Sequence, residues 1–308
     1  MRIAVIGAGA TGALYGGYLS RHNDVLLVDV NQAQVDAINE KGMAIREPDG
    51  SMTQCRPKAA VNTQGLAPAD VVVLFVKSMY SRAALQANSS LIGPDTYLMT
   101  LQNGSGHEET LLEFVPRDRV IIGTTQHNCA VLGPGEIRHG GSGKTCIGLL
   151  DGQSRRIAHI ADMFSACGLE TVCEDDVQRL IWNKLFTNVS ASVLTGILQT
   201  PLGYIVENEH AWTLCELLVR EAVDVAAGDG YIFDAEEKIA DVRAVCERSP
   251  KGLISIYADL RDGRKTEVDT ISGSVVRAGK RNGMGAPTHE TIVSLVHALE
   301  GKTISDRA

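Results

Sequence analysis

An amine, an amide and a hydroxyl recur at intervals of four residues in the apolar segment IWNKLFTNVSAS, residues 181–192. They belong to Lys184, Asn188 and Ser192. Side chains four residues apart on an α-helix differ by about 40° in direction, so this spacing predicts a polar line on one helix face. A lysine beside an apolar stripe is costly to bury unless it has a partner or a ligand. From the pattern alone we favour a surface stripe, with Lys184 extending to solvent, over a ligand-binding face.

A glycine-rich turn, GAGATG, follows the apolar run RIAVI at the start of the chain and matches the pattern G-x-G-x-x-G. In such a turn the first glycine permits a tight bend, the second lets the backbone approach a pyrophosphate, and the third allows close helix packing. The helix that starts there directs its N-terminus at the phosphate charge. An ordinary glycine turn is the alternative. The motif predicts a dinucleotide-binding segment formed by Gly7, Ala8, Gly9, Ala10, Thr11 and Gly12.

An acidic residue, Asp29, follows the glycine turn at the end of the next apolar run. A carboxylate at this position can accept hydrogen bonds from the ribose hydroxyls of NAD and would repel the 2′-phosphate of NADP. The next three residues, VNQ at 30–32, include no arginine that could hold that phosphate. The sequence therefore predicts NAD as the preferred cofactor, with NADP as the second option. The alternative is that Asp29 only caps the following helix.

The elements that must position these residues alternate between strands and helices over the first half of the chain. This alternation predicts a parallel, doubly wound sheet. A Gly-rich stretch with a GPG turn predicts an antiparallel hairpin region at 125–150, before a helix near 153–167 and a strand near 169–173. Apolar runs predict the remaining strands at 2–6, 24–30, 71–76, 96–101 and 119–124.

The second half of the chain has helical patterns from 176 to 299, interrupted by glycine and proline clusters. A chain of 308 residues is long enough for two domains. We therefore expect a Rossmann domain at 1–174 and an all-α domain at 175–308 that serves substrate binding and dimerisation. The sequence leaves the oligomeric state open, and a homodimer is one option.

Composition excludes several other classes of protein. The formal net charge of −8 is spread along the chain without acidic or basic blocks, which argues against nucleic acid or anionic lipid as a partner. No window contains about 18 continuous apolar residues and no signal-peptide pattern is present, so we expect no membrane span and no leader. Seven cysteines without a CxxC pair fit neither a disulfide framework nor a zinc site, so we expect no metal and a cytoplasmic location.

Six segments together resemble the ketopantoate reductase (2-dehydropantoate 2-reductase) family, whose members join an N-terminal Rossmann domain to an α-helical C-terminal domain. The glycine motif is generic, but the lysine and asparagine of the helix, combined with TEVD and QNG in this order, are more specific. The resemblance spans essentially the whole chain. The segments are GAGATG at 7–12, FVKS at 75–78, LQNGSG at 101–106, GTTQH at 123–127, WNKLFTN at 182–188 and KTEVDTISGSVV at 265–276.

The resemblance changes the interpretation of the polar line. In the family the helix lysine donates a proton to the substrate carbonyl while the nicotinamide delivers hydride, and the motif match gives this role to Lys184. Hydride addition to a ketone builds alkoxide charge, which an ammonium can stabilise and neutralise. Asn188 matches the family's substrate-binding asparagine. Ser192 stands where the family usually has a second asparagine, so this departure concerns the substrate more than the reaction.

Further residues carry over from the same motifs. Lys77 and Asn103 match residues beside the cofactor and the reacting centre; the alternatives are a solvated lysine and a turn asparagine. Cys129 falls where the family's backbone contacts the cofactor, and Ser255 matches a substrate-contacting serine. Glu267 matches an active-site glutamate that bonds a ribose or substrate hydroxyl and orients the lysine, with a favourable charge at a helix N-terminus as the alternative.

The reaction implied by the resemblance is reduction of the 2-oxo acid 2-dehydropantoate to (R)-pantoate. A D-2-hydroxyacid dehydrogenase of the D-mandelate type is a close alternative, because Asp29, Ser192 and GSGHEE at 104–109 resemble that NAD-using branch. An opine-type or 6-phosphogluconate-type dehydrogenase shares the architecture but not the TEVD and QNG segments. A non-catalytic NAD-binding sensor is less favoured, because Lys184, Asn188 and Glu267 are all present.

Overall fold

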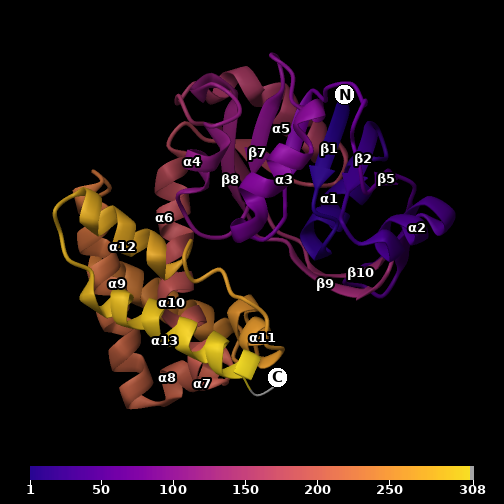
Figure 1. The fold of residues 1–308 in the computed structure, drawn as a ribbon. Coiled ribbons are helices and arrows are strands. Elements are labelled where there is room, and N and C mark those ends of the chain that lie inside the picture. The colour runs from indigo at the N-terminus through magenta and orange to yellow at the C-terminus, as the bar shows by residue number, and fades with distance from the viewer. Residues whose placement is uncertain (306–308) are drawn as a thin grey trace. The chain divides into compact units, whose positions relative to one another are not determined.

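The computed structural model describes residues 1–305, which divide into two compact units (Figure 1). The first unit contains residues 1–102 and 107–180, and the second contains residues 103–106 and the chain from Ile181 onward. The loop 103–106 therefore belongs to the second unit, although the chain on both sides of it belongs to the first. The expected fold class is confirmed: the first unit is an α/β domain on a mostly parallel sheet, and the described part of the second is helical.

The main sheet of the first unit has eight strands, and β1 lies at the point where the strand order reverses. β1 pairs in parallel with β2 on one side and with β6 on the other. The carboxyl ends of these strands therefore meet at one edge, which is where open α/β sheets bind ligands. The sheet is parallel as expected except for one antiparallel pair, β11 with β8. In spatial order the strands are β12 (Thr171–Cys173), β11 (Thr145–Leu149), β8 (Val120–Thr125), β7 (Tyr97–Thr100), β6 (Val71–Leu74), β1 (Arg2–Ile6), β2 (Asp24–Val28) and β5 (Lys58–Ala60).

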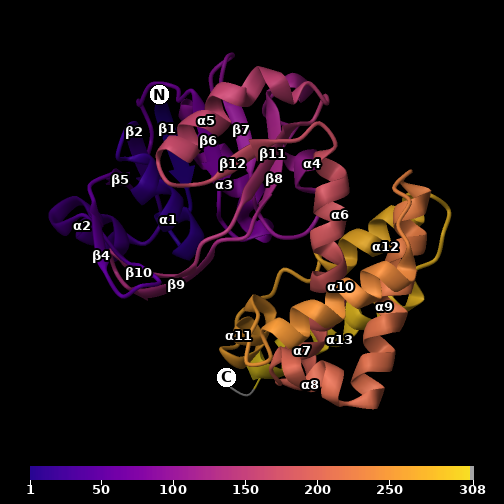
Figure 2. The same cartoon turned by 180° about the vertical axis from the view of Figure 1, so that it is seen from behind.

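Helices cover both faces of this sheet, which is why central strands such as VVVL of β6 are apolar and buried at every position. Figure 1 shows α3 over one face, and Figure 2 shows α5 over the opposite face. The α-helices of the first unit are α1 (Ala10–Leu19), α2 (Gln32–Lys41), α3 (Ser81–Ala87), α4 (His107–Leu111) and α5 (Ala158–Ala166). Its short 3₁₀ helices are η1 (Ser78–Tyr80), η2 (Ser89–Leu91), η3 (Arg117–Arg119) and η4 (Ser154–Ile157).

A second sheet of four strands lies in the same unit, in the order β4 (Met52–Cys55), β3 (Met43–Arg46), β10 (Glu136–Gly141) and β9 (Asn128–Gly133). The antiparallel pairing of β9 with β10 confirms the expected hairpin. β10 also pairs in parallel with β3, and β3 pairs antiparallel with β4. No strand was expected between residues 43 and 60. β3, β4 and β5 are each four residues or fewer, too short for an alternating pattern to identify them.

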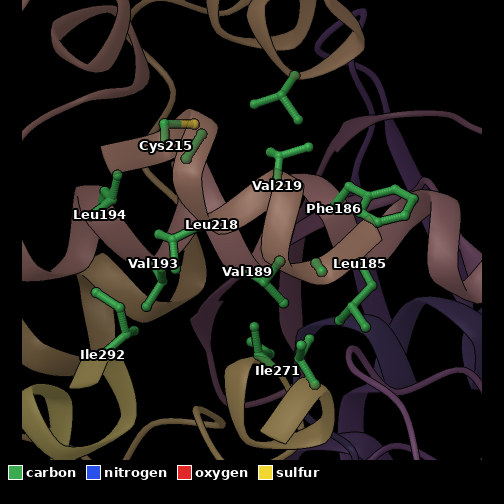
Figure 3. Close-up of a cluster of buried hydrophobic side chains, with 14 of the residues drawn as sticks. Leu185, Phe186, Val189, Val193, Leu194, Cys215, Leu218, Val219, Ile271 and Ile292 are labelled. Atoms are coloured by element: carbon green, nitrogen blue, oxygen red, sulfur yellow. The ribbon is translucent and has the colours of Figure 1, made fainter. Parts of the chain in front are cut away.

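The second unit packs its helices around a continuous apolar core (Figure 3). Leu185 and Val189 approach this core from the segment that carries Lys184, while Leu218 and Val219 contribute from the 20-residue helix α9. The elements are α6 (Val177–Thr187), which begins at the end of the first unit, the π-helix η5 (Asn188–Ser192), α7 (Val193–Leu198), α8 (Leu202–Glu207), α9 (Glu209–Gly228), α10 (Ala235–Arg248), α11 (Ser255–Arg261), α12 (Ser272–Arg281) and α13 (Pro287–Ser305).

Candidate active site

The glycine turn after β1 has the geometry that a dinucleotide requires. Gly7 has φ of +99°, and a Cβ there would lie 2.7 Å from the backbone nitrogen of Val76. A Cβ on Gly12 would lie 1.9 Å from the Gly7 carbonyl oxygen, so only glycine lets α1 start this close to the strand. A Cβ on Gly9 would meet no atom within 4 Å. Gly7 and Gly12 are therefore packed against other parts of the chain, whereas no other atom of the chain crowds Gly9.

The N-terminus of α1 is available to an anion. Gly9 is the N-cap residue and provides no side chain to the first amides of the helix, and the first turn contains no acidic residue. The first N–H groups of a helix carry partial positive charge and need acceptors. Together with the open face at Gly9, this arrangement fits the pyrophosphate of a dinucleotide.

Asp29 lies beside the turn, directly after β2. Its Oδ2 accepts a hydrogen bond from the backbone N–H of Ala8 at 2.7 Å, and its Oδ1 accepts one from the N–H of Asn31 at 2.9 Å. The N-cap residue of α2 is Asn31, whose side chain accepts a bond from Gln34 N–H. Asp29 is thus not the cap of this helix, and its carboxylate is tied to the residue that precedes Gly9.

Gln34 supports the glycine turn from a position that the sequence analysis did not single out. Its Nε2 donates to the carbonyl of Ala8 at 2.9 Å, while its Oε1 accepts from the N–H of Gly135 at 2.9 Å. The buried side chain therefore links the glycine turn to the hairpin between β9 and β10. No pattern marks it, because a glutamine in a polar helix is ordinarily exposed.

Two further predicted cofactor residues lie in the first unit. Lys77 is half-buried at the N-cap of η1, three residues after β6 ends at Leu74. The neighbouring N–H of Phe75 donates to Ile6 O at 2.8 Å, which fixes this segment next to the glycine turn. Cys129 lies on β9, and burial raises the pKa of its thiol to about 12. The thiol is therefore neutral at ordinary pH, and the contact of the Cys129 backbone with a cofactor stays a prediction.

Lys184 lies on α6 and has an altered pKa. The residue as a whole is only half-buried, yet its ammonium is desolvated by the surrounding protein, and this burial lowers the pKa of Lys184 to about 8. The expectation of a surface lysine extending to solvent, drawn from the pattern alone, is therefore wrong. A lysine with a pKa this close to neutrality can both stabilise negative charge and release a proton.

The polar line continues from α6 into a π-helix, which was not predicted. Asn188 is its first residue and is half-buried, whereas Ser192 is its last and is 3% exposed. A π-helix closes hydrogen bonds over five residues and turns less per residue than an α-helix, so Ser192 does not continue the 40° drift expected from regular α geometry. Single π-turns occur frequently at functional sites. The wider turn also buries Ser190, whose Oγ is bonded to Phe186 O.

The loop with Asn103 and the turn with Glu267 lie together in the second unit. Ser105 N–H donates to Thr270 O at 2.9 Å, and Gly104 has φ of +100°. The carbonyl of Glu267 accepts bonds from the N–H groups of Thr270 and Ile271 at 3.1 and 3.0 Å. Glu267 is thus in a turn before α12, not in the first helical turn. The structure brings the QNG and TEVD motifs side by side although they are far apart in sequence.

Ser255 is the first residue of α11 and is exposed, while Ile254 is the N-cap residue. Nothing in its local geometry distinguishes it from other exposed serines.

Among residues 1–305 no group of histidine, cysteine, aspartate and glutamate side chains could hold a metal ion. The same residues include no helix that is long and apolar enough to span a membrane.

Comparison with known proteins agrees with this geometry. Residues 3–152 match the family model of ketopantoate reductase PanE/ApbA, and residues 176–300 match the model of its C-terminal domain. A 2-dehydropantoate 2-reductase of Halobacterium salinarum is 34% identical over 302 residues, which are 97% of this chain and 99% of the relative.

Two solved structures are similar over almost the whole chain. D-mandelate dehydrogenase with NADH and anilino(oxo)acetate is 30% identical with a TM-score of 0.92, covering 98% of this chain and 99% of its own. A PanE/ApbA family ketopantoate reductase from Ralstonia eutropha JMP134 is 28% identical with a TM-score of 0.90 and the same coverage. With both family models matched and the nucleotide turn formed, the chain belongs to the ketopantoate reductase family and is an NAD(P)-dependent 2-oxo acid reductase of that kind.

Proposed function

We propose that this enzyme uses NADH to reduce 2-dehydropantoate to (R)-pantoate. The observation that carries the proposal is Lys184, whose pKa is lowered to about 8 on a helical segment that also presents Asn188. A general acid works best when its pKa lies near the operating pH. Lys184 meets this condition, and an ordinary lysine does not.

In this proposal Lys184 donates its proton to the carbonyl oxygen of the 2-oxo acid. The bound dinucleotide supplies a hydride to the carbonyl carbon, which places negative charge on that oxygen. The Lys184 ammonium stabilises this charge and its proton completes the product hydroxyl. The neutral amine then regains a proton from solvent. Asn188 holds the substrate by hydrogen bonds, and Glu267 accepts a hydrogen bond that orients Lys184.

The preference for NADH rests on Asp29. Its carboxylate adjoins the glycine turn and would repel a 2′-phosphate, while the following residue, Val30, is 97% exposed and offers no positive charge. The D-mandelate dehydrogenase structure contains NADH, which supports the same choice. By the family resemblance, Lys77, Asn103 and the backbone at Cys129 would help to hold the cofactor.

A second candidate function is NAD-dependent reduction of other 2-oxo acids to D-2-hydroxy acids, of the D-mandelate type. It is favoured by the similarity to D-mandelate dehydrogenase and by Ser192, which replaces the second asparagine expected for ketopantoate reductases. Serine is smaller than asparagine and makes fewer hydrogen bonds. Ser192 and Ser255 would then contact a less polar substrate. A sensor without activity is not supported, because a desolvated lysine has no role in simple dinucleotide binding.

A panel of 2-oxo acids assayed with NADH and with NADPH tests the proposal. We expect NADH-dependent reduction of 2-dehydropantoate, with a lower kcat/KM for NADPH. If phenylglyoxylate or a 2-oxoisovalerate-like acid gives the highest kcat/KM, the D-mandelate-type function replaces the proposed one. If no 2-oxo acid in the panel oxidises either cofactor, both functions are wrong.

A further inference from the structure

The loop 103–106 approaches the turn 267–270 more closely than a side chain on the loop would allow. The N–H of Ser105 donates to the carbonyl of Thr270 at 2.9 Å. A Cβ on Gly104 would lie 2.2 Å from the same oxygen, and Gly104 has a φ of +100° that favours glycine. The close approach therefore depends on glycine at position 104. It sets the distance between the loop and the turn.

Arg277 joins the same two segments through its guanidinium. Nη1 donates to the carbonyl of Asp269 at 2.7 Å, and Nη2 donates to the carbonyl of Ser105 at 3.4 Å. A guanidinium presents its donors in a rigid planar fork, so one side chain can set the separation of two carbonyl groups. Nη2 also lies 3.1 Å from the position that a Cβ on Gly106 would occupy.

The base of Arg277 and the turn are both fixed. Arg277 lies on α12, where the nearby residues Val275 and Ala278 are 0% and 3% exposed in the core of the second unit. On the other side of the turn, Thr266 donates from its N–H and its Oγ1 to Glu300 Oε1, each at 2.7 Å. The guanidinium therefore links the loop 103–106 to a turn that is anchored on both sides.

We infer that Arg277 is a positioning residue that sets the place of Asn103 relative to Glu267. Asn103 precedes Ser105 by two residues, and Glu267 precedes Asp269 by two residues. One bond of Arg277 thus fixes the loop of Asn103 and the other fixes the turn of Glu267. The inference rests on the proposed function, in which both residues act at the reacting centre. Small displacements of such groups reduce rates strongly.

A double-mutant cycle tests this role, with the variants Arg277→Ala and Asn103→Ala and their combination. We expect Arg277→Ala to lower kcat/KM about ten-fold with a wild-type Tm, and to have less than about a two-fold effect when Asn103 is already alanine. Arg277→Lys should restore part of the loss, because its single ammonium can still donate to one of the two carbonyl groups but cannot span both as the guanidinium does. Lys280→Ala is the matched control, since Lys280 is an exposed cation on the same helix whose partner is Glu290.

Amide hydrogen exchange of the folded protein gives a readout that does not need turnover. The Ser105 N–H is held by Thr270 O, so Arg277→Ala should speed its exchange while Lys280→Ala leaves it unchanged. Unchanged exchange, or fully additive effects in the cycle, would overturn the role of Arg277. If the wild-type protein reduces no 2-oxo acid, the proposed function fails, and the exchange result still decides whether Arg277 orders the loop.

Discussion

The carboxylate of Asp29 is bonded to the backbone N–H of Ala8 at 2.7 Å, so the acidic residue after β2 is part of the glycine turn after β1. The contact places a negative charge next to Gly9, whose open face receives the dinucleotide in the proposed function. The carboxylate therefore shapes the turn, and in the proposed function it would also exclude a 2′-phosphate from the ribose that binds beside it.

Substitution Asp29→Asn separates these roles. The asparagine oxygen can still accept the Ala8 bond, so the fold should be retained. We expect NADH to bind about ten-fold more weakly, because a charge-assisted hydrogen bond to ribose becomes a neutral one. NADPH should bind no worse than to the wild-type protein. Titration of both cofactors measures this, with Glu40→Gln on the exposed side of α2 as the control; a parallel loss of NADH and NADPH affinity would contradict the role of Asp29.

The glycine turn provides a matched pair of substitutions. Gly9→Ala adds a methyl group where no protein atom lies within 4 Å, so the Tm should stay near that of the wild-type protein while NADH binds at least about ten-fold more weakly. Gly12→Ala adds a methyl group 1.9 Å from Gly7 O, so this variant should have a lower Tm than the wild-type protein. Thermal unfolding and NADH titration distinguish the two effects. Normal NADH binding by Gly9→Ala would show that the open face is not the pyrophosphate site.

A buried histidine makes the second unit sensitive to acid. His289 is 0% exposed, and burial lowers its pKa from 6.5 to about 4, although the charge of Glu221 and the Leu218 carbonyl oppose this shift. The unfolded chain therefore takes up a proton at a higher pH than the folded chain. Stability from this group is complete above pH 6.5 and is lost as pH falls toward 4.

We expect the free energy of unfolding to fall by more than about 1 kcal/mol between pH 7 and pH 5 because of His289. His289→Gln should show a smaller fall over this interval, since glutamine can donate to Leu218 O without titrating. His210→Gln, an exposed histidine on α9, should behave as the wild-type protein does. Denaturant unfolding at the two pH values makes the comparison. Equal losses in all three proteins would rule out the contribution of His289.

The fold and the nucleotide turn were accessible from the sequence because their signals are local. RIAVI, GAGATG and the apolar runs define strands and a turn within a few residues, and their expected positions agree with β1, β2, β6, β7 and β8. The strands β3, β4 and β5 were missed because three or four residues do not establish a period. The pairing of β10 with β3 joins segments about 90 residues apart, which no local pattern reports.

In the candidate site, too, the features that depend on contacts between distant segments could not be predicted from the sequence. Lys184 and Asn188 were singled out by spacing and by family resemblance, but the π-helix that begins at Asn188 left no recognisable pattern in the sequence. Desolvation of Lys184 likewise arises from tertiary packing. Gln34 and Arg277 act through backbone carbonyls of distant segments, and such bonds leave no pattern in the sequence.

The pH dependence of NADH oxidation is the measurement that tests the proposed function most directly, made on the wild-type protein and on Lys184→Ala with the best 2-oxo acid of the panel. Because Lys184 must carry a proton and its pKa is about 8, the wild-type kcat/KM should fall as pH rises through 8. Lys184→Ala should lower kcat/KM at least about a hundred-fold. Its kcat/KM should also no longer fall as pH rises through 8. A variant that keeps the wild-type rate, or the fall in kcat/KM near pH 8, would contradict the assignment of Lys184 as the proton donor.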